Sequence, residues 1–318
     1  MKEKYFKHNR NIQRKYWSKT STCCFLLILA LLLGGCSSPT STKKNTPSAK
    51  TPTPAVTETP TPTVTETPES KEQSLEDTEE TFDFNQSLTL KAPNPAAGET
   101  PRVLFVGNSH TYTNDLPIIF SEIAAAMGHQ SDVQELTEGS YTLTLFADHT
   151  DELGSMLNQK LTEETWDFVI LQENTNDAFS FPEENMLPAA ASLDEKIRAA
   201  GGQTALLMTW TPKEGASILG PEYVQSVLAQ NTISVSKELD SLLIPGGVAF
   251  MRCLEQYPQI ELWDEDGMHP SLEGSYLAAC LAYAVIFQES PVGCTYNPGL
   301  EEETTAQLQE LAAGFLVL

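Results

Sequence analysis

The stretch Arg102-Val-Leu-Phe-Val-Gly-Asn-Ser-His-Thr-Tyr112 decides how the rest of the chain is interpreted. Its apolar run, Val103 to Val106, is rich in β-branched and aromatic residues and predicts a strand that is buried on both faces. Gly107 ends this run, and a helix is expected soon after it. Ser109 is therefore expected on a turn at the carboxyl edge of a parallel sheet, where open α/β sheets place their ligands.

A serine in that position can act as a nucleophile if a base reaches it. Gly-Asn-Ser is also ordinary turn chemistry, so the turn alone does not establish catalysis. A second element lies far downstream, where Asp266 stands three residues before His269 in a segment that contains Gly267 and Pro270. A carboxylate on such a loop can accept the Nδ1 proton of the histidine and leave Nε2 free to act as a base. The alternative interpretation is a helix-capping loop with a surface histidine.

Together these elements resemble blocks of the SGNH (GDSL-like) hydrolase family. Gly107-Asn-Ser109 stands where the family has Gly-Asp-Ser, and Asp266-x-x-His269-Pro matches its last block. Two intermediate blocks follow strand-like runs in the family's order, Glu138-Gly-Ser140 and Asn174-Thr-Asn-Asp177. The resemblance covers the chain from Arg102 to about Phe287.

The resemblance implies a flavodoxin-like three-layer α/β/α fold with a mostly parallel five-stranded sheet. It implies a triad of Ser109, His269 and Asp266. The implied oxyanion donors are the backbone N–H groups of Ser109 and Gly139 and the side chain of Asn176. It implies no metal and no cofactor.

Several residues depart from the family pattern or compete for a role. Asn108 replaces the usual aspartate, His110 replaces an aliphatic residue, and a Leu-Gln-Glu run precedes Asn174, which itself replaces a glycine. Competing candidates are His149 for the base, Asp264 and Glu265 for the orienting acid, and Gln172 and Asn174 for the oxyanion amide. Trp210 ends a predicted strand at the same edge and either lines a cleft or packs at its rim.

Strand-like and helix-like runs alternate along the chain, which indicates a parallel sheet with helices on both faces. The strands are expected at 103–106, 133–136, 168–171, 205–209 and 242–250. The helices are expected at 117–127, 152–161, 188–200, 221–243, 271–287 and 301–315.

The N-terminus has a different character. Residues 1–35 combine a basic start with a short apolar run, which is typical of a secretory signal peptide. Leu33-Gly-Gly-Cys36 resembles a bacterial lipobox, which implies lipidation of Cys36 and an extracytoplasmic protein anchored to the bacterial membrane. Residues 36–97 are rich in Thr, Pro and Glu and predict a disordered stalk. Residues 98–318 are expected to form the hydrolase-like domain.

Charge and cysteine content limit the possible functions. The formal net charge is −24, and removal of residues 1–35 would bring it near −30, since seven of the 19 basic residues but one of the 43 acidic residues lie there. This acidity argues against nucleic-acid partners. Three cysteines, 253, 280 and 294, follow Cys36, and a bridge between Cys253 and Cys294 is one possibility.

The sequence therefore predicts a lipid-anchored serine ester hydrolase. Its expected substrates are small-molecule or glycan esters, with removal of acyl groups such as acetyl. Two alternatives stay open: a lipid or short-chain esterase, and a surface binding protein that keeps the fold without turnover. Asn108 in place of aspartate is the main argument for the second alternative.

Overall fold

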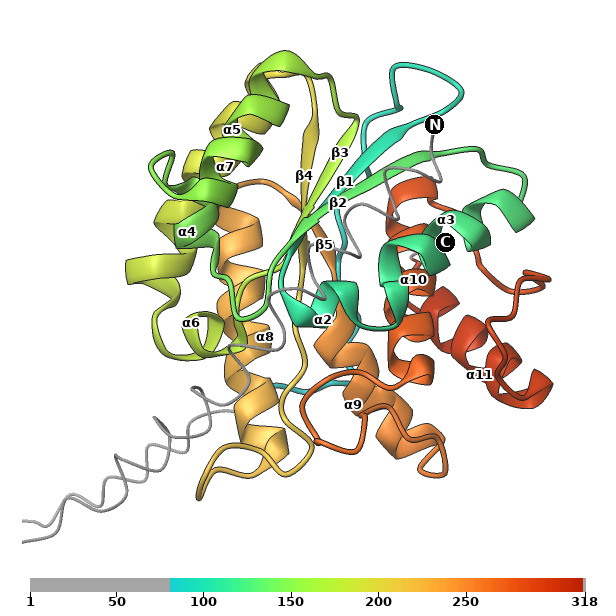
Figure 1. Ribbon diagram of the computed structural model, residues 1–318. Helices are drawn as coiled ribbons and strands as arrows, with labels where there is room; N and C mark the ends of the chain where they lie inside the picture. Colours follow the sequence, from blue (N-terminus) through green and yellow to red (C-terminus); the bar gives the residue numbers. More distant parts are fainter. Residues whose placement is uncertain (1–80, 317–318) are drawn as a thin grey trace, which may run out of the picture. The chain divides into compact units, whose positions relative to one another are not determined.

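The computed structural model describes residues 81–316, and these contain one sheet of five parallel strands in the order β2-β1-β3-β4-β5 (Figure 1). This confirms the predicted α/β fold with a parallel five-stranded sheet. The strands are β1 (Arg102–Gly107), β2 (Asp132–Thr137), β3 (Phe168–Leu171), β4 (Gln203–Leu207) and β5 (Leu242–Ile244).

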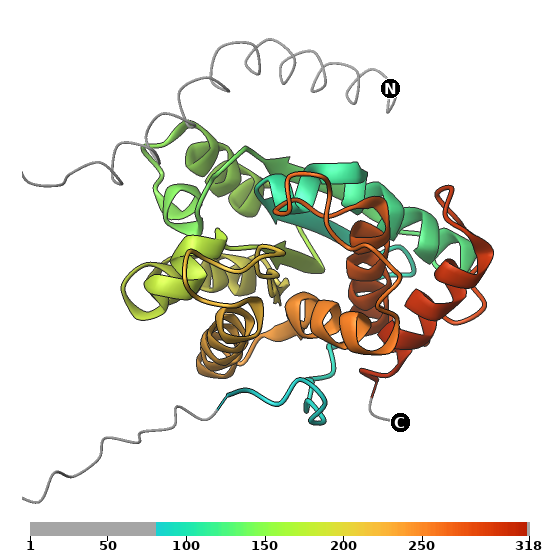
Figure 2. The same ribbon diagram turned by 90° about the horizontal axis from the view of Figure 1, so that it is seen from below.

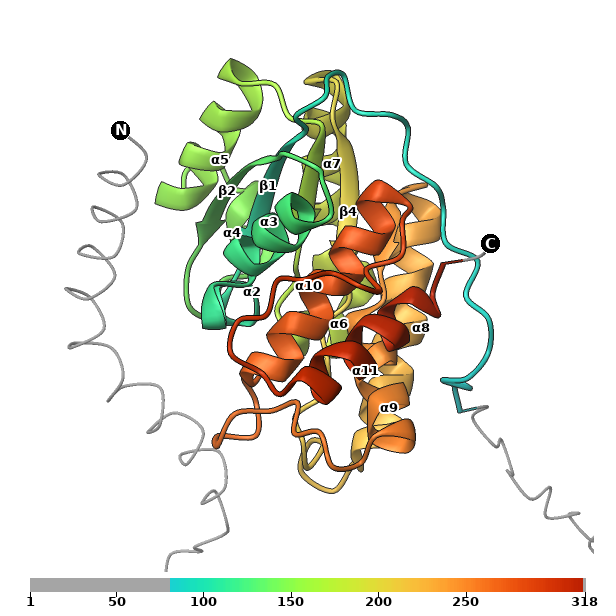
Figure 3. The ribbon, with the colours of Figure 1, turned by 90° about the vertical axis from the view of Figure 1, so that its right-hand side faces the viewer.

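Helices cover both faces of the sheet (Figures 2 and 3). On one face lie α3 (Leu116–Ala126), α9 (Gly246–Gln256), α10 (Leu272–Phe287) and α11 (Glu302–Ala313). On the other lie α4 (Leu143–Ala147), α5 (Glu152–Glu163), α7 (Leu187–Ala199) and α8 (Pro221–Glu238). The shorter elements are α2 (Ser109–Tyr112), η1 (Thr113–Asp115), α6 (Thr175–Ser180) and η2 (Pro182–Met186).

The core lies where these layers meet. Val103 to Val106 of β1 and all four residues of β3 are buried, because both faces of these central strands are covered. Helix α10 is buried from Gly274 to Ile286, since it packs against α3, α9, α11 and β5 at once. A helix that is apolar on all sides is expected in such a place. Within residues 81–316 no helix is long and apolar enough to cross a membrane.

The region after α8 differs from the sequence prediction. Residues 242–250 were expected to form one strand, but β5 ends at Ile244, and α9 begins at Gly246. The predicted helix 221–243 also ends earlier, at Glu238. Residues 242–251 are all buried, and a fully buried apolar run fits a strand or a helix equally well by periodicity. Pro245 alone separates the two elements, and the two glycines after it begin α9.

The chain before β1 packs against the domain, although it was predicted to belong to the stalk. The Phe82 backbone N–H donates to Ser226 Oγ at 2.7 Å, and Arg252 Nε donates to the Phe84 carbonyl at 2.6 Å. Nearer to β1, the Ala97 N–H donates to Asp167 Oδ1 at 2.7 Å. The packed part of the chain therefore begins well before the expected boundary at residue 98. The predicted signal peptide, Cys36 and most of the predicted stalk lie outside the described residues.

Truncation tests this boundary. A soluble form that begins at residue 98 should be less stable than one that begins at residue 81, because it loses four half-buried apolar side chains, Phe82, Phe84, Leu88 and Leu90. At about 1.5–3 kcal/mol for each fully buried side chain, we expect a loss of about 3 kcal/mol. Thermal denaturation should show a fall in Tm of roughly 6–12 °C. Equal Tm values for the two forms would mean that residues 81–97 do not stabilise the domain and belong to the stalk, as the sequence predicted.

Candidate active site

The strand order places a topological switch point between β1 and β3, because the chain leaves β1 toward β2 on one side and leaves β3 toward β4 on the other. Ligands of open α/β sheets bind in the crevice at this point. Helix α2 lies at the carboxyl end of β1 (Figure 1), and Ser109 is its half-buried first residue.

The turn that carries Ser109 is held by Asn108, which is 1% exposed and caps the N-terminus of α2. Asn108 Oδ1 accepts the His110 backbone N–H at 3.1 Å, and Asn108 Nδ2 donates to the Tyr141 carbonyl at 3.0 Å. The second bond ties the serine turn to the segment that follows β2. An aspartate, the family's usual residue, has no hydrogen to donate to that carbonyl. The departure at position 108 therefore has a structural reason.

Replacing Asn108 by aspartate should for this reason be harmful. The carboxylate would face the Tyr141 carbonyl without a proton between them, and such a lost buried hydrogen bond costs about 1–3 kcal/mol. We expect a lower Tm and a lower rate of ester turnover, since the serine turn loses its tie to the segment after β2. Asn297→Asp is the control: Asn297 Nδ2 also donates to a carbonyl, that of Leu300, but in an exposed turn. Equal effects of the two substitutions would contradict this explanation.

Gly139 lies close to Ser109, as the pairing of β1 with β2 requires. Gly107 pairs with Thr137, so Ser109 and Gly139 each stand two residues beyond this pair. A Cβ atom on Gly139 would lie 3.3 Å from the hydroxyl of Tyr112, which is the last residue of the short helix that Ser109 begins. The Gly139 N–H donates to its neighbour Glu138 at 2.9 Å, so the Glu138 carboxylate occupies this donor in the structure.

The structure brings Asp266 and His269 together. Asp266 Oδ2 accepts a hydrogen bond from His269 Nδ1 at 2.5 Å, while Asp266 Oδ1 accepts the backbone N–H groups of Met268 and His269 at 2.8 and 2.9 Å. Burial opposes ionisation of Asp266, but these hydrogen bonds outweigh it and lower the pKa of the carboxyl to about 2. Asp266 is therefore ionised at neutral pH and orients the imidazole through Nδ1.

Two contacts hold the His269 loop against the serine turn. The centroids of the His110 and His269 rings lie 5.8 Å apart. Asn114 Nδ2 donates to the Pro270 carbonyl at 2.9 Å. Burial and the neighbouring His269 lower the pKa of His110 to about 4, so His110 is neutral above that pH. His110, next to Ser109 in sequence, therefore acts as a packing contact between the two parts of the site.

The positions of the Asn174 and Asn176 side chains after β3 differ from those that the resemblance to the family's sequence blocks implies. Val106 pairs with Leu171, so Asn174 is level with Ser109, whereas Asn176 lies further along, exposed in the first turn of α6. Asn174 caps α6 by accepting the Asn176 N–H at 3.0 Å, and its Nδ2 lies 3.4 Å from the Ser140 carbonyl. The role of Asn176 stays a prediction, and Asn174 is the second candidate.

The competing residues lie apart from this arrangement. His149 is exposed beyond the end of α4. Asp264 Oδ1 accepts the Glu265 N–H, and both side chains are exposed. Trp210 is fully buried and stacks on Phe250, so it packs beneath the site. In residues 81–316, no group of three or more His, Cys, Asp or Glu side chains could hold a metal ion, and Cys253, Cys280 and Cys294 are free and buried.

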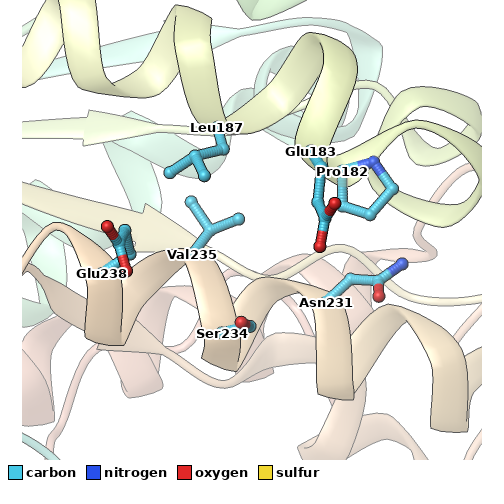
Figure 4. A pocket seen from close by; sticks show the side chains of 7 residues that line it. All are labelled: Pro182, Glu183, Leu187, Asn231, Ser234, Val235 and Glu238. Carbon is cyan, nitrogen blue, oxygen red and sulfur yellow. The ribbon is translucent and has the colours of Figure 1, made fainter.

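Two cavities differ in their relation to the site. One, of about 380 Å³, borders the loop of His269. It is lined by polar and apolar groups together, from Asn114, Lys213, Glu261, Trp263, Asp264, Glu265, Gly267, Ser271 and Leu272. The other, of about 260 Å³, lies between η2–α7 and α8 and contains none of the predicted site residues (Figure 4). Of these two cavities, the first is the one that borders the predicted site, because Gly267 in its lining lies between Asp266 and His269 in the chain.

Comparison with known proteins supports the fold. Neither a protein-family model nor a curated protein matches the chain. A proposed SGNH hydrolase from Slackia heliotrinireducens is similar in structure, with a TM-score of 0.53 and 26% sequence identity over 58% of this chain and 98% of its own. The chain has the SGNH-hydrolase fold. A DUF4886 family protein from Bacteroides uniformis is also similar in structure, with a TM-score of 0.59 and 17% identity over 67% of this chain and 93% of its own.

Proposed function

We propose that this protein is a serine ester hydrolase in which Ser109 is the nucleophile, His269 the base and Asp266 the group that orients the base. The observation that carries the proposal is the Asp266–His269 pair, which His110 and Asn114 hold against the Ser109 turn at the switch point of the sheet. The structural similarity to a proposed SGNH hydrolase supports the reaction class.

In the proposed reaction, Ser109 Oγ attacks the ester carbonyl while His269 Nε2 takes its proton. The tetrahedral intermediate expels the alcohol, which receives that proton, and water then hydrolyses the acyl-enzyme by the same route. The Ser109 and Gly139 backbone N–H groups and the Asn176 side chain are the proposed oxyanion donors, with Asn174 as the alternative to Asn176. Glu138 has to release the Gly139 N–H before that group can serve.

The proposed substrates are acyl esters of polar alcohols, such as acetylated glycans. The cavity beside the His269 loop supports this choice, because hydroxyl groups of a sugar can hydrogen-bond to its carboxylate, amide and ammonium side chains. A panel of acetyl, butyryl and long-chain esters together with acetylated glycans tests the assignment. A preference for long-chain esters would favour a lipid esterase.

A fluorophosphonate probe tests the reaction class. The probe should attach covalently to Ser109, located by mass spectrometry of the labelled peptide, because it reacts with activated serines. Ser109→Ala should remove the label, while Ser140→Ala, at a serine in the neighbouring segment, should keep it. Labelling at any serine other than Ser109 would overturn the assignment of the nucleophile.

A binding protein without turnover is the second candidate. It is favoured by the hydrogen bond of the Gly139 N–H to Glu138, which leaves this proposed oxyanion donor occupied. This candidate predicts no labelling and no ester turnover, together with saturable glycan binding in calorimetry. Glu138→Ala separates the two candidates further, since it should speed turnover in an esterase by freeing the donor.

We also propose that the protein is anchored outside the cytoplasm through a lipid on Cys36. The support is the Leu33-Gly-Gly-Cys36 sequence behind a basic and apolar N-terminus. Cys36→Ala should abolish incorporation of labelled fatty acid and release the protein from the membrane fraction or leave it unprocessed. Equal labelling of Cys36→Ala and the wild-type chain would exclude this anchor.

A further inference from the structure

The Leu-Gln-Glu run that departs from the family pattern places two buried polar side chains at the end of β3. Gln172 is 1% exposed and Glu173 is 2% exposed. Both lie beside the switch point, since Gln172 follows Leu171 and its backbone N–H donates to the Val106 carbonyl of β1. The structure shows polar contacts for both side chains.

Gln172 contacts the turn on both sides of Ser109. Its Oε1 accepts the Asn108 backbone N–H at 2.9 Å and the Thr111 hydroxyl at 2.9 Å, and its Nε2 donates to the Glu173 carbonyl at 2.7 Å. The side chain also explains Gly107, because a Cβ atom there would lie 2.6 Å from Gln172 Oε1. One amide thus fixes the backbone before the serine and the side chain after it.

Glu173 joins the two segments that carry the proposed oxyanion donors. Its Oε1 accepts the Asn174 N–H at 2.6 Å and the Leu143 N–H at 3.0 Å. Leu143 begins α4 directly after the segment of Gly139, and that segment is also tied to Asn174 through the Ser140 carbonyl. A single carboxyl oxygen therefore sets the distance between the loop after β2 and the loop after β3.

The second oxygen of Glu173, Oε2, is buried and has no hydrogen-bond partner. Burial raises the pKa of this carboxyl to about 7, the two backbone N–H groups oppose the rise, and the Asp177 carboxylate on α6 adds to it. A buried carboxyl with an unpaired oxygen is costly for folding, and groups of this kind occur preferentially at functional sites.

We propose that Gln172 and Glu173 are positioning residues of the active site: Gln172 sets the turn of Ser109, and Glu173 sets the segments of Gly139 and Asn174. This inference rests on the proposed ester hydrolase function. Neither side chain touches the reacting atoms in this assignment. Their effect on catalysis comes through the geometry of the groups they hold, and misplacement by about 1 Å can cost 10²-fold in rate.

Gln172→Met tests whether Gln172 positions the turn of Ser109, because methionine keeps the length of the side chain and removes its hydrogen bonds. We expect kcat and the rate of fluorophosphonate labelling to fall at least tenfold, with KM changed less than threefold. Gln309→Met is the matched control: Gln309 is a buried glutamine with three hydrogen bonds, on α11, away from the switch point. It should lower Tm and keep kcat. If Gln172→Met lowers Tm but keeps the wild-type kcat, Gln172 does not position the Ser109 turn for catalysis.

Glu173→Met and Glu173→Gln test whether Glu173 positions the segments of Gly139 and Asn174. Methionine removes the acceptor of the Asn174 and Leu143 N–H groups and should lower kcat at least tenfold. Glutamine keeps one carbonyl oxygen for both donors and should restore most of kcat. It also removes the ionisation, so a limb near pH 7 in the pH profile of kcat should disappear. If both variants retain wild-type kcat and pH profile, Glu173 does not position the site.

Amide hydrogen exchange tests the positioning independently of turnover. Gln172→Met should speed exchange in residues 108–112, and Glu173→Met should speed exchange in residues 138–143 and 174–176, while Gln309→Met should change neither. This measurement applies even if the protein proves to have no esterase activity. Unchanged exchange at these segments would refute the inference. Should Gln172→Met fail to fold, Thr111→Val removes one of the two bonds to Gln172 Oε1 and should show smaller changes in the same direction.

Discussion

Replacing His269 by alanine is expected to lower kcat by about 10⁶-fold, the order found when the base of a Ser-His-Asp triad is removed. Without the imidazole, the Ser109 hydroxyl has no group to take its proton as it attacks. The loop should keep its shape, because Asp266 Oδ1 still accepts the backbone N–H groups at positions 268 and 269. Steady-state kinetics with an acetyl ester measure the effect, and thermal denaturation checks that the variant is still folded.

His149→Ala and His129→Ala are the matched controls, and each should keep kcat within twofold. His149 is exposed after α4, while His129 stacks on Phe287 and contacts Glu289, on the surface that α3 and α10 form. If His149→Ala instead abolishes turnover and His269→Ala does not, the base has to be reassigned.

The pH dependence gives a second test of the base. The pKa of Asp266 is about 2 and that of His110 about 4, so neither group titrates between pH 5 and 8. Glu173, with a pKa of about 7, does titrate there, and Glu173→Gln removes it. If kcat/KM of the Glu173→Gln variant still changes with pH between 5 and 8, that change therefore belongs to the proposed general base. Its absence would argue against histidine as the base.

The parts of the fold that the sequence predicted well are those with one clear pattern. The buried strands β1 and β3 are short apolar runs that contain β-branched residues, and α10 is long and apolar. The short helices α2, α4 and α6 were missed because four to six residues are too few to show a helical period. Their starts depend on side-chain caps, Asn108, Thr142 and Asn174.

The site was predictable where its residues are local in sequence. Asp266 and His269 are three residues apart on one loop, and this spacing suggested the contact that the structure shows. The roles of Gln172 and Glu173 depend on contacts with residues 30 to 64 positions away, which only the register of the parallel strands brings together. The same register makes Asn174 an alternative to Asn176 as the oxyanion donor, which comparison with the family's sequence blocks could not show. The signal that was available was the Leu-Gln-Glu run itself, two polar residues directly after an apolar strand.

Asp266→Asn is expected to lower kcat by about 10⁴-fold, the order found when the triad aspartate becomes asparagine. The amide oxygen can still accept the backbone N–H groups of Met268 and His269, so the loop should persist. The amide nitrogen then faces His269 Nδ1 and donates to it, which favours the tautomer with its proton on Nε2. That tautomer cannot take the proton of Ser109, so the loss should appear in kcat and leave KM nearly unchanged.

Controls and stability measurements distinguish this role from a structural one. With a small acetyl ester, which has no sugar to contact the cavity beside the His269 loop, Asp264→Asn and Glu265→Gln should change kcat less than twofold. Because the pKa of Asp266 lies below its ordinary value, its contribution to stability is present above about pH 4 and is lost as the pH falls toward 2. The difference in Tm between the wild-type chain and Asp266→Asn should therefore shrink over that range. A severe loss in Asp264→Asn with a mild one in Asp266→Asn would move the orienting role to Asp264.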